Sequence, residues 1–161
     1  MTNKNKKIVL NIKYFEGATK LQKITKGNWI DVYARKDVFV EQGKRAMIPL
    51  GFALELPKGY EGHLAPRSST FKTWGVIQTN SIGVIDDTYI GDNDEWMMPV
   101  YCLQGKDKVL EGTGQQKGTL IHKGDKIGQF RIMESMPPIV FNEVESLNNK
   151  DRGGFGSTGE R

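Results

Sequence analysis

The chain has 161 residues, of which 26% are charged and 37% hydrophobic, and its formal net charge is +4. This length suits one domain with a sizeable core, and the mild charge without a basic stripe predicts no direct binding of nucleic acid. The single cysteine excludes an internal disulfide and a cysteine zinc site. No apolar run has the length of a membrane span and the polar N-terminus lacks a signal-peptide core, so an intracellular, cytoplasmic location is expected.

Short β-strands separated by glycine and proline turns are predicted along most of the chain. Between them, Ser68 or Ser69 is a good N-cap for one or two helical turns that run through Trp74 and end at Gly75. Many short strands without a long amphipathic helix predict an all-β sandwich or jelly roll. The strands are expected near residues 7–15, 29–34, 38–40, 46–49, 52–56, 63–66, 76–79, 83–90, 95–103, 119–122 and 127–133.

The stretch 83–91, Gly-Val-Ile-Asp-Asp-Thr-Tyr-Ile-Gly, is predicted to form a hairpin with its bend at Asp86. Val84 and Ile85 favour a strand, the next three residues favour a turn, and Tyr89 opens the expected return strand. A carboxylate at the bend could hold a water for attack while the tyrosine supports a flat or ring-shaped ligand. Aspartate and tyrosine are also common in ordinary surface hairpins, so this stretch alone leaves both interpretations open.

Two further segments carry groups suited to phosphate. The run Arg67-Ser68-Ser69 places a guanidinium beside two hydroxyls and the N–H groups of the expected helix start, although a plain N-cap with a surface arginine uses the same residues. The tail 152–159 has four glycines, which let backbone N–H groups converge on an anion. That composition also suits a frayed terminus, but Phe155 among the glycines favours a functional segment.

Five segments, in order, resemble the five motifs of trimeric dUTPases (dUTP diphosphatases). They span nearly the whole chain, and the third and fifth are the most specific. The second has Arg-Ser-Ser where dUTPases usually have Arg-Ser-Gly, a variant that is also typical of the related dCTP deaminases. The segments are 29–33 (Trp-Ile-Asp-Val-Tyr), 65–69 (Ala-Pro-Arg-Ser-Ser), 83–91, 124–129 (Gly-Asp-Lys-Ile-Gly-Gln) and 152–159 (Arg-Gly-Gly-Phe-Gly-Ser-Thr-Gly).

The resemblance implies a jelly-roll homotrimer, with active sites shared between subunits, that hydrolyses dUTP to dUMP and diphosphate with Mg²⁺. Such an enzyme limits uracil incorporation into DNA and supplies dUMP for dTTP synthesis. By position, Asp86 would activate the attacking water and touch the sugar 3′-hydroxyl, and Tyr89 would pack under the deoxyribose. Asp31 would support the metal indirectly, through water, because the substrate phosphates hold Mg²⁺. The other implied substrate-binding residues are Asn80, Gly83, Val84 and Ile85 at the uracil edge, Arg67, Ser68, Ser69 and Gln129 at the phosphates, and Arg152, Phe155, Ser157 and Thr158 from another subunit.

The predicted organisation is a compact domain at 1–142 with an exposed insert at about 104–118, followed by a mobile arm at 143–161. The insert is also a candidate surface for a protein partner. Two alternatives stay open from the sequence. One is a dCTP deaminase of the same superfamily, against which Tyr89 and the glycine-rich tail argue. The other is a nucleotide-switched regulator that binds a protein through the insert.

Overall fold

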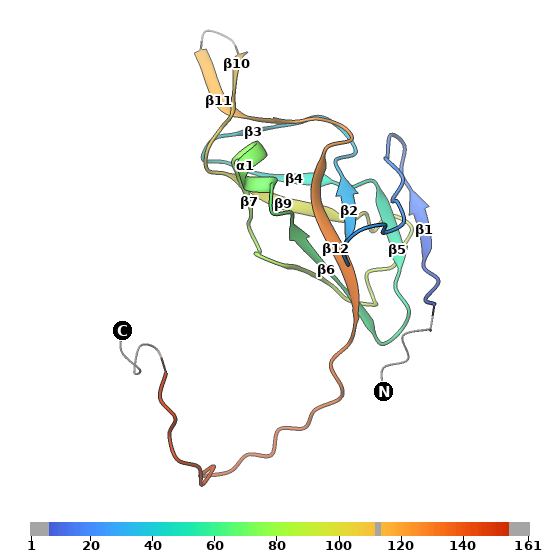
Figure 1. The fold of residues 1–161 in the computed structure, drawn as a ribbon, viewed down its shortest axis with the longest axis vertical. Coiled ribbons are helices and arrows are strands. Elements are labelled where there is room, and N and C mark those ends of the chain that lie inside the picture. The colour runs from blue at the N-terminus through green and yellow to red at the C-terminus, as the bar shows by residue number, and fades with distance from the viewer. Residues whose placement is uncertain (1–6, 112–113, 155–161) are drawn as a thin grey trace.

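The computed structural model describes residues 7–111 and 114–154. Within these ranges it contains twelve strands and one short helix (Figure 1). The predicted all-β fold is therefore confirmed. The elements are β1 (Asn11–Tyr14), β2 (Ile30–Tyr33), β3 (Val38–Glu41), β4 (Arg45–Pro49), β5 (Phe52–Glu55), β6 (Tyr60–Pro66), α1 (Thr70–Trp74), β7 (Val76–Gln78), β8 (Gly83–Ile85), β9 (Met97–Cys102), β10 (Asp107–Glu111), β11 (Gly114–Ile121) and β12 (Lys126–Glu134).

The strands form four small antiparallel sheets, with the orders β1-β5, β10-β11-β3, β2-β12-β6-β8 and β4-β9-β7. In the largest sheet β6 is central, because it pairs with β12 on one side and β8 on the other. Its register sets Ala65 opposite Gln129 and Leu64 opposite Gly83. One strand thus aligns the second, third and fourth motif segments.

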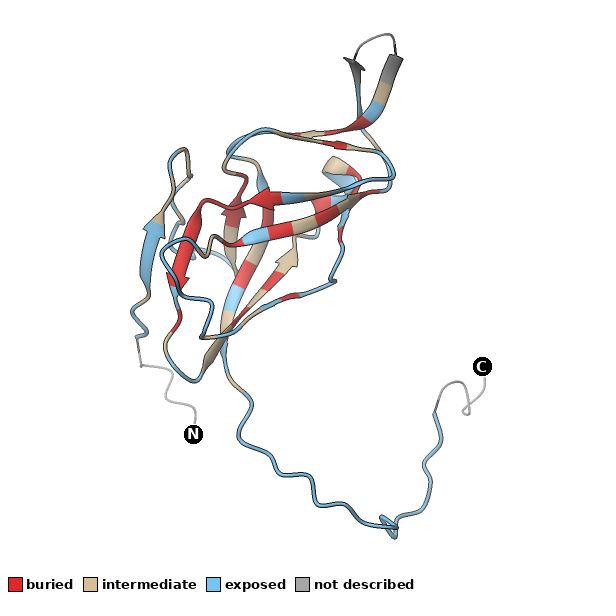
Figure 2. Ribbon diagram, turned by 180° about the vertical axis from the view of Figure 1, so that it is seen from behind, coloured by how far each residue is buried: buried red, intermediate tan, exposed pale blue. Residues whose placement is uncertain are grey.

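The core is built around three aromatic rings, from β5, from β12 and from the residue just before β9. Phe52, Trp96 and Phe130 lie with ring centroids 5.1–5.8 Å apart, and the Trp96–Phe130 pair is edge-to-face. Aliphatic residues of the other strands, such as Ile48 and Leu64, surround them and are fully buried. Figure 2 shows the buried residues on the strands of the body and exposed residues along the tail. Inward-facing apolar side chains of short strands therefore close a continuous core, as the strand pattern requires.

The helix α1 ends as predicted but begins differently. Gly75 adopts a left-handed conformation, with φ of 68°, and its N–H donates to the carbonyl of Phe71 at 2.7 Å. Ser69 flanks the N-terminus, but its side chain makes no cap bond. The hydroxyl of Thr70 instead accepts from the N–H of Arg67 at 2.8 Å and donates to the carbonyl of Ile127 at 3.0 Å. Ser69 therefore occupies the predicted N-cap position without a side-chain cap, and the buried Thr70 fastens the start of the helix to Arg67 and to β12.

The predicted hairpin at 83–91 is wrong in its second half. Strand β8 pairs with β6, and residues 86–91 form a turn and loop without a return strand. Asp86 Oδ1 accepts from the N–H of Thr88 at 2.8 Å, and the N–H of Tyr89 donates to the carbonyl of Asp86 at 3.3 Å. These local bonds occupy backbone groups that a return strand would have offered to β8.

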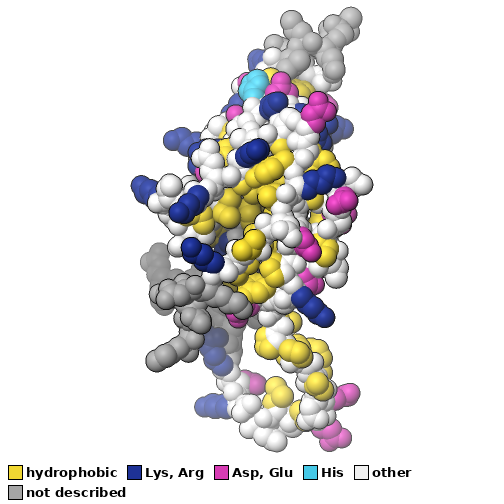
Figure 3. Space-filling view, turned by 90° about the vertical axis from the view of Figure 1, so that its right-hand side faces the viewer, with side chains coloured by type: hydrophobic (Ala, Val, Ile, Leu, Met, Phe, Trp, Pro, Cys, Tyr) yellow, Lys and Arg dark blue, Asp and Glu magenta, His cyan; other side chains and the backbone are white. Residues whose placement is uncertain are grey.

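Two segments extend beyond the body (Figure 1). Strands β10 and β11 form a hairpin from the polar segment 104–118, and the end of β11 pairs with β3. At the other end of the body, residues 135–154 run as an exposed tail without regular secondary structure. The tail carries apolar side chains, among them Val140 and Phe141, which are 93% and 91% exposed (Figure 3).

In the part of the chain that is described, no helix has the length and apolar character needed to cross a membrane.

We expect Gly62→Ala to destabilise the fold, because a Cβ at this position of β6 would collide with the indole of Trp96. Trp96 is fully buried, so relieving the clash must move the aromatic core. The expected loss is about 1–3 kcal/mol of unfolding free energy, measured by denaturant titration at fixed protein concentration. Gly154→Ala is the matched control, since a Cβ there meets no atom within 4 Å. An unchanged midpoint for Gly62→Ala would contradict this account of the core.

Candidate functional site

An open cavity of about 340 Å³ lies beside β8. The third motif segment supplies one wall, and strands β4 and β9 supply the opposite one. Its lining is mostly apolar with a few polar groups, which is typical of a site for a small organic ligand. The cavity is lined by the predicted residues Asn80, Gly83, Val84, Ile85, Asp86 and Tyr89, together with Met47, Leu64, Glu95, Trp96, Met97 and Pro99.

Asp86 is an exposed carboxylate at the edge of this cavity. Both the hydroxyl and the N–H of Thr88 donate to its Oδ1. These two bonds hold the pKa of Asp86 below its ordinary value of 3.8. Asp86 is therefore ionised at neutral pH. Since no described residue donates to Oδ2, that oxygen can accept a proton or hydrogen bond from a ligand or water.

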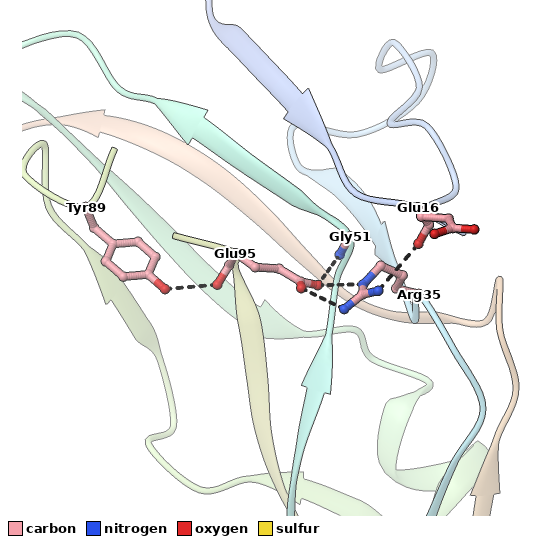
Figure 4. Close-up of polar contacts among 5 residues, drawn as sticks. All are labelled: Glu16, Arg35, Gly51, Tyr89 and Glu95. Carbon is pink, nitrogen blue, oxygen red and sulfur yellow. Dashed lines mark hydrogen bonds and ion pairs between the residues drawn. The ribbon is translucent and has the colours of Figure 1, made fainter. Parts of the chain in front are cut away.

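Tyr89 is held by a chain of contacts that ends at a partly buried ion pair (Figure 4). Its hydroxyl donates to the carbonyl of Glu95 at 3.0 Å. The carboxylate of Glu95 accepts hydrogen bonds from Nη2 and Nε of Arg35 at 2.9 and 3.0 Å, and from the N–H of Gly51 at 3.0 Å. Desolvation, followed by the charges of Asp94 and Glu95, raises the pKa of Tyr89 above 10.0. The hydroxyl thus stays protonated as a donor, and its anchoring leaves the ring as part of the cavity wall.

A second open cavity, of about 400 Å³, is lined by residues of the first, second and fourth motif segments. Pairing of β12 with β2 sets Gln129 opposite Asp31. Arg67 Nε lies 3.1 Å from Asp31 Oδ1, and Lys126 Nζ lies 3.6 Å from Oδ2. Gln129 Nε2 donates to the carbonyl of Pro66 at 3.1 Å. The lining residues are Lys26, Gly27, Asn28, Trp29, Asp31, Arg67, Ser68 and Gln129.

This second cavity has the chemistry of an anion site. The guanidinium of Arg67 presents several N–H donors, of which Asp31 uses only some. Ser68 and Gln129 add neutral hydrogen-bonding groups, and Lys26 adds a second cation. A fork of guanidinium donors beside hydroxyl and amide groups suits phosphate oxygens.

The structure does not bring all predicted site residues together. The two cavities share no lining residue. Ser69 lines neither of them, and Arg152 lies on the exposed tail. Phe155, Ser157 and Thr158 are outside the described residues. One chain, as described, therefore presents two separate half-sites: a nucleoside-sized cavity with a carboxylate, and a cationic cavity.

Sequence reasoning missed several residues of these half-sites. Gln78 of β7 donates to Asn80 Oδ1 at 2.8 Å, and Lys26 lines the cationic cavity. Met47 and Met97, on paired strands, line the nucleoside-sized cavity. The sequence signal that could have pointed to Met47 and Met97 is a methionine on a predicted strand. Lys26 lies in a polar stretch where nothing distinguishes it from neighbouring lysines.

Comparison with known proteins decides the family. Residues 29–159 match the sequence profile of dUTPase. The chain belongs to the dUTPase family. It is 49% identical to the SPbeta prophage-derived deoxyuridine 5'-triphosphate nucleotidohydrolase YosS of Bacillus subtilis (strain 168), over 94% of this chain and 99% of that protein. It is 36% identical to the deoxyuridine 5'-triphosphate nucleotidohydrolase of Anaeromyxobacter sp. (strain Fw109-5), over 81% and 80% of the two chains.

Solved dUTPases share the fold at lower identity. The Staphylococcus bacteriophage 80alpha dUTPase with dUpNHpp has a TM-score of 0.74 and 22% identity, over 94% of this chain and 98% of that one. A mutant dUTPase from phage phi11 of S. aureus, solved with a structural Mg(II) ion, has a TM-score of 0.71 and 19% identity, over 88% and 100%. The jelly-roll-like fold predicted from the motifs is thereby confirmed. The deaminase and regulator alternatives are not favoured by these matches.

We expect Thr88→Val to raise the pKa of Asp86 toward its ordinary value of 3.8, because it removes the hydroxyl donor that contributes most to the depressed pKa. The backbone bond from residue 88 stays, so the rise should be partial. A site-resolved carbon NMR titration of the Asp86 carboxyl measures it. Thr73→Val, on α1 and away from the cavity, is the control. An unchanged pKa in Thr88→Val would show that the turn does not set the charge of Asp86.

Proposed function

We propose that this dUTPase family member hydrolyses dUTP to dUMP and diphosphate, with Asp86 as the base that activates the attacking water. The observation that carries the proposal is the state of Asp86: an ionised carboxylate with one oxygen fixed by Thr88 and the other free, at the edge of a nucleoside-sized cavity. A positioned carboxylate needs to give only modest help, because breaking a phosphoanhydride depends mainly on positioning and charge neutralisation.

The nucleoside half-site would select deoxyuridine. Asn80 and the backbone of Gly83–Ile85 line the cavity and would face the base, where a close fit would leave little room for a 5-methyl group. The ring of Tyr89, fixed through its hydroxyl, would lie under the deoxyribose where a 2′-hydroxyl would clash. Sites that hydrogen-bond a substrate edge can reject the wrong one by about 10⁴-fold, because mismatched polar groups stay unpaired.

The cationic half-site would hold the phosphates through Arg67, Ser68 and Gln129, with Ser69 next to them in the chain. No described group of three or more His, Cys, Asp or Glu side chains could hold a metal ion. Asp31 already faces Arg67 and Lys126, so its carboxylate suits a supporting role through water. This donor set fits a Mg²⁺ held mainly by the substrate phosphates, where it would neutralise their charge.

A homotrimer with shared active sites would join the two half-sites. They share no lining residue within one chain, so a nucleotide that needs both fits best between chains. The exposed apolar tail supports the same arrangement, since such side chains are normally covered by a partner. The tail would deliver Arg152, Phe155, Ser157 and Thr158 to another subunit's nucleotide. The described residues of the hairpin 104–118 line neither cavity, and the hairpin stays the predicted surface for any protein partner.

Asp86→Asn should abolish most turnover while the fold and nucleotide binding persist. The amide keeps the shape of the side chain but cannot take a proton from water, so kcat on dUTP should fall by about 10²-fold or more. Diphosphate release measures kcat, and calorimetry with the non-hydrolysable dUpNHpp measures binding. Asp87→Asn, the neighbouring carboxylate whose Oδ2 accepts from the N–H of Gly59, is the matched control. Wild-type turnover in Asp86→Asn would exclude this residue as the base.

Mixed trimers should recover activity that neither parent has. Asp86→Asn lacks the base and Arg67→Ala lacks the phosphate clamp, so each homotrimer should be nearly inactive. If each site takes the two half-sites from neighbouring chains, one junction in every three of a mixed trimer pairs the two intact halves, so the purified mixed trimers should regain about a third of wild-type turnover. Differently tagged chains, refolded together and purified through both tags, provide the mixed species. Verified mixed trimers without recovered turnover would mean that both half-sites serve one chain.

A further inference from the structure

Gln78 is a buried amide directly beneath the nucleoside half-site. It ends β7, and only 5% of its surface is exposed. Its Nε2 donates to the carbonyl of Leu64 at 3.0 Å and to Asn80 Oδ1 at 2.8 Å, so both of its N–H bonds are used. Leu64 and Asn80 both line the cavity. Gln78 therefore connects the central strand β6 to the one side-chain amide that faces the ligand space.

The hydrogen-bond logic fixes the orientation of both amides. A backbone carbonyl can only accept, so the bond to Leu64 requires the NH₂ end of Gln78 at that position. The second N–H of Gln78 then requires an acceptor, which selects the oxygen end of Asn80. The NH₂ end of Asn80 is left on the other side, where no described residue accepts from it. Asn80 therefore presents a hydrogen-bond donor, its NH₂ group, to the cavity instead of an acceptor.

Burial of the Gln78 side chain is also energetically unfavourable in a way that packing does not explain. Its Oε1 is buried and finds no hydrogen-bond donor among the described residues. A buried polar atom without a partner is unfavourable, and an apolar side chain at this position would avoid it. Strand β7 is short and Gln78 faces a core of apolar residues. A role in orienting Asn80 accounts for the retention of an amide here.

We propose that Gln78 is a positioning residue that determines base specificity by fixing the Asn80 amide with its NH₂ group toward the ligand. This inference rests on the proposed function, in which Asn80 faces the pyrimidine edge. A fixed donor placed at position 4 of the ring, where uracil and cytosine differ, matches the carbonyl oxygen of uracil. It opposes the exocyclic amino group of cytosine, because two donors would face each other and lose their hydrogen bonds.

The test compares dUTP and dCTP in Gln78→Glu and Gln78→Met. A carboxylate at 78 cannot donate, so Asn80 would turn its NH₂ inward and present its oxygen to the base. Gln78→Glu should lower the ratio of kcat/KM for dUTP over dCTP by about tenfold or more, mainly through a higher KM for dUTP. Gln78→Met removes the constraint without reversing it and should lower the ratio less. Competitive inhibition by dUMP and dCMP gives a second readout that does not depend on turnover.

The controls separate the alternatives. Gln116→Glu, the same change on β11 away from both cavities, should leave the ratio unchanged. A merely structural role for Gln78 would reduce turnover of both nucleotides in proportion, so an unaltered ratio in Gln78→Glu and Gln78→Met overturns the inference. If Gln78→Glu does not fold, Gln78→Met decides alone. Failure of the proposed function looks different, because wild-type protein would then not prefer dUTP over dCTP at all.

Discussion

The pairing of β6 on both of its edges is the constraint on which the two half-sites depend. Through β12 it sets Ala65 opposite Gln129, which brings the second and fourth motifs to the cationic cavity. Through β8 it sets Leu64 opposite Gly83, which places the third motif at the other cavity. A shift of one residue would turn every side chain of the slipped strand to the opposite face and dismantle one half-site. The aromatic contacts of Phe130 and the close fit of Gly62 against Trp96 oppose such a shift.

The two half-sites differ in charge as well as in position. Asp86 is negative and exposed, whereas Arg67 is held beside Asp31 and Lys126 in a mainly cationic setting. Asp86 and Arg67 line different cavities of one chain, which would leave Asp86 free to act as the proposed base. A nucleoside triphosphate has an uncharged base and a polyanionic end. Its base would suit the nucleoside half-site, and its phosphates would suit the cationic half-site. The ligand itself then supplies much of the attraction that holds the half-sites in register.

Local sequence signals predicted the strands, the αL glycine that ends α1 and the motif residues that line both cavities. They failed where a residue's partner is distant in sequence. Thr70 fastens the start of the helix because its hydroxyl reaches Ile127 on β12, which no local pattern encodes. The anchoring of Tyr89 was also not visible in the sequence, because its hydroxyl bonds the carbonyl of Glu95, whose carboxylate an arginine 60 residues away fixes in turn. Gln78 is an ordinary strand residue in the sequence, and only its side-chain bonds to the carbonyl of Leu64 on β6 and to Asn80 show that it supports the cavity wall.

In the proposed trimer, the tail would link assembly to catalysis. Val140 and Phe141 expose almost their whole side chains, which costs free energy that docking on another chain would recover. Arg152 lies a few residues further along the same exposed segment. Docking of the apolar part would raise the local concentration of Arg152 and the glycine-rich end at the neighbour's phosphates, in the manner of a tethered ligand. Nucleotide binding and tail docking are then coupled, and each must strengthen the other by the same factor. A glycine-rich end that binds weakly by itself can in this way close over the substrate and still release the product.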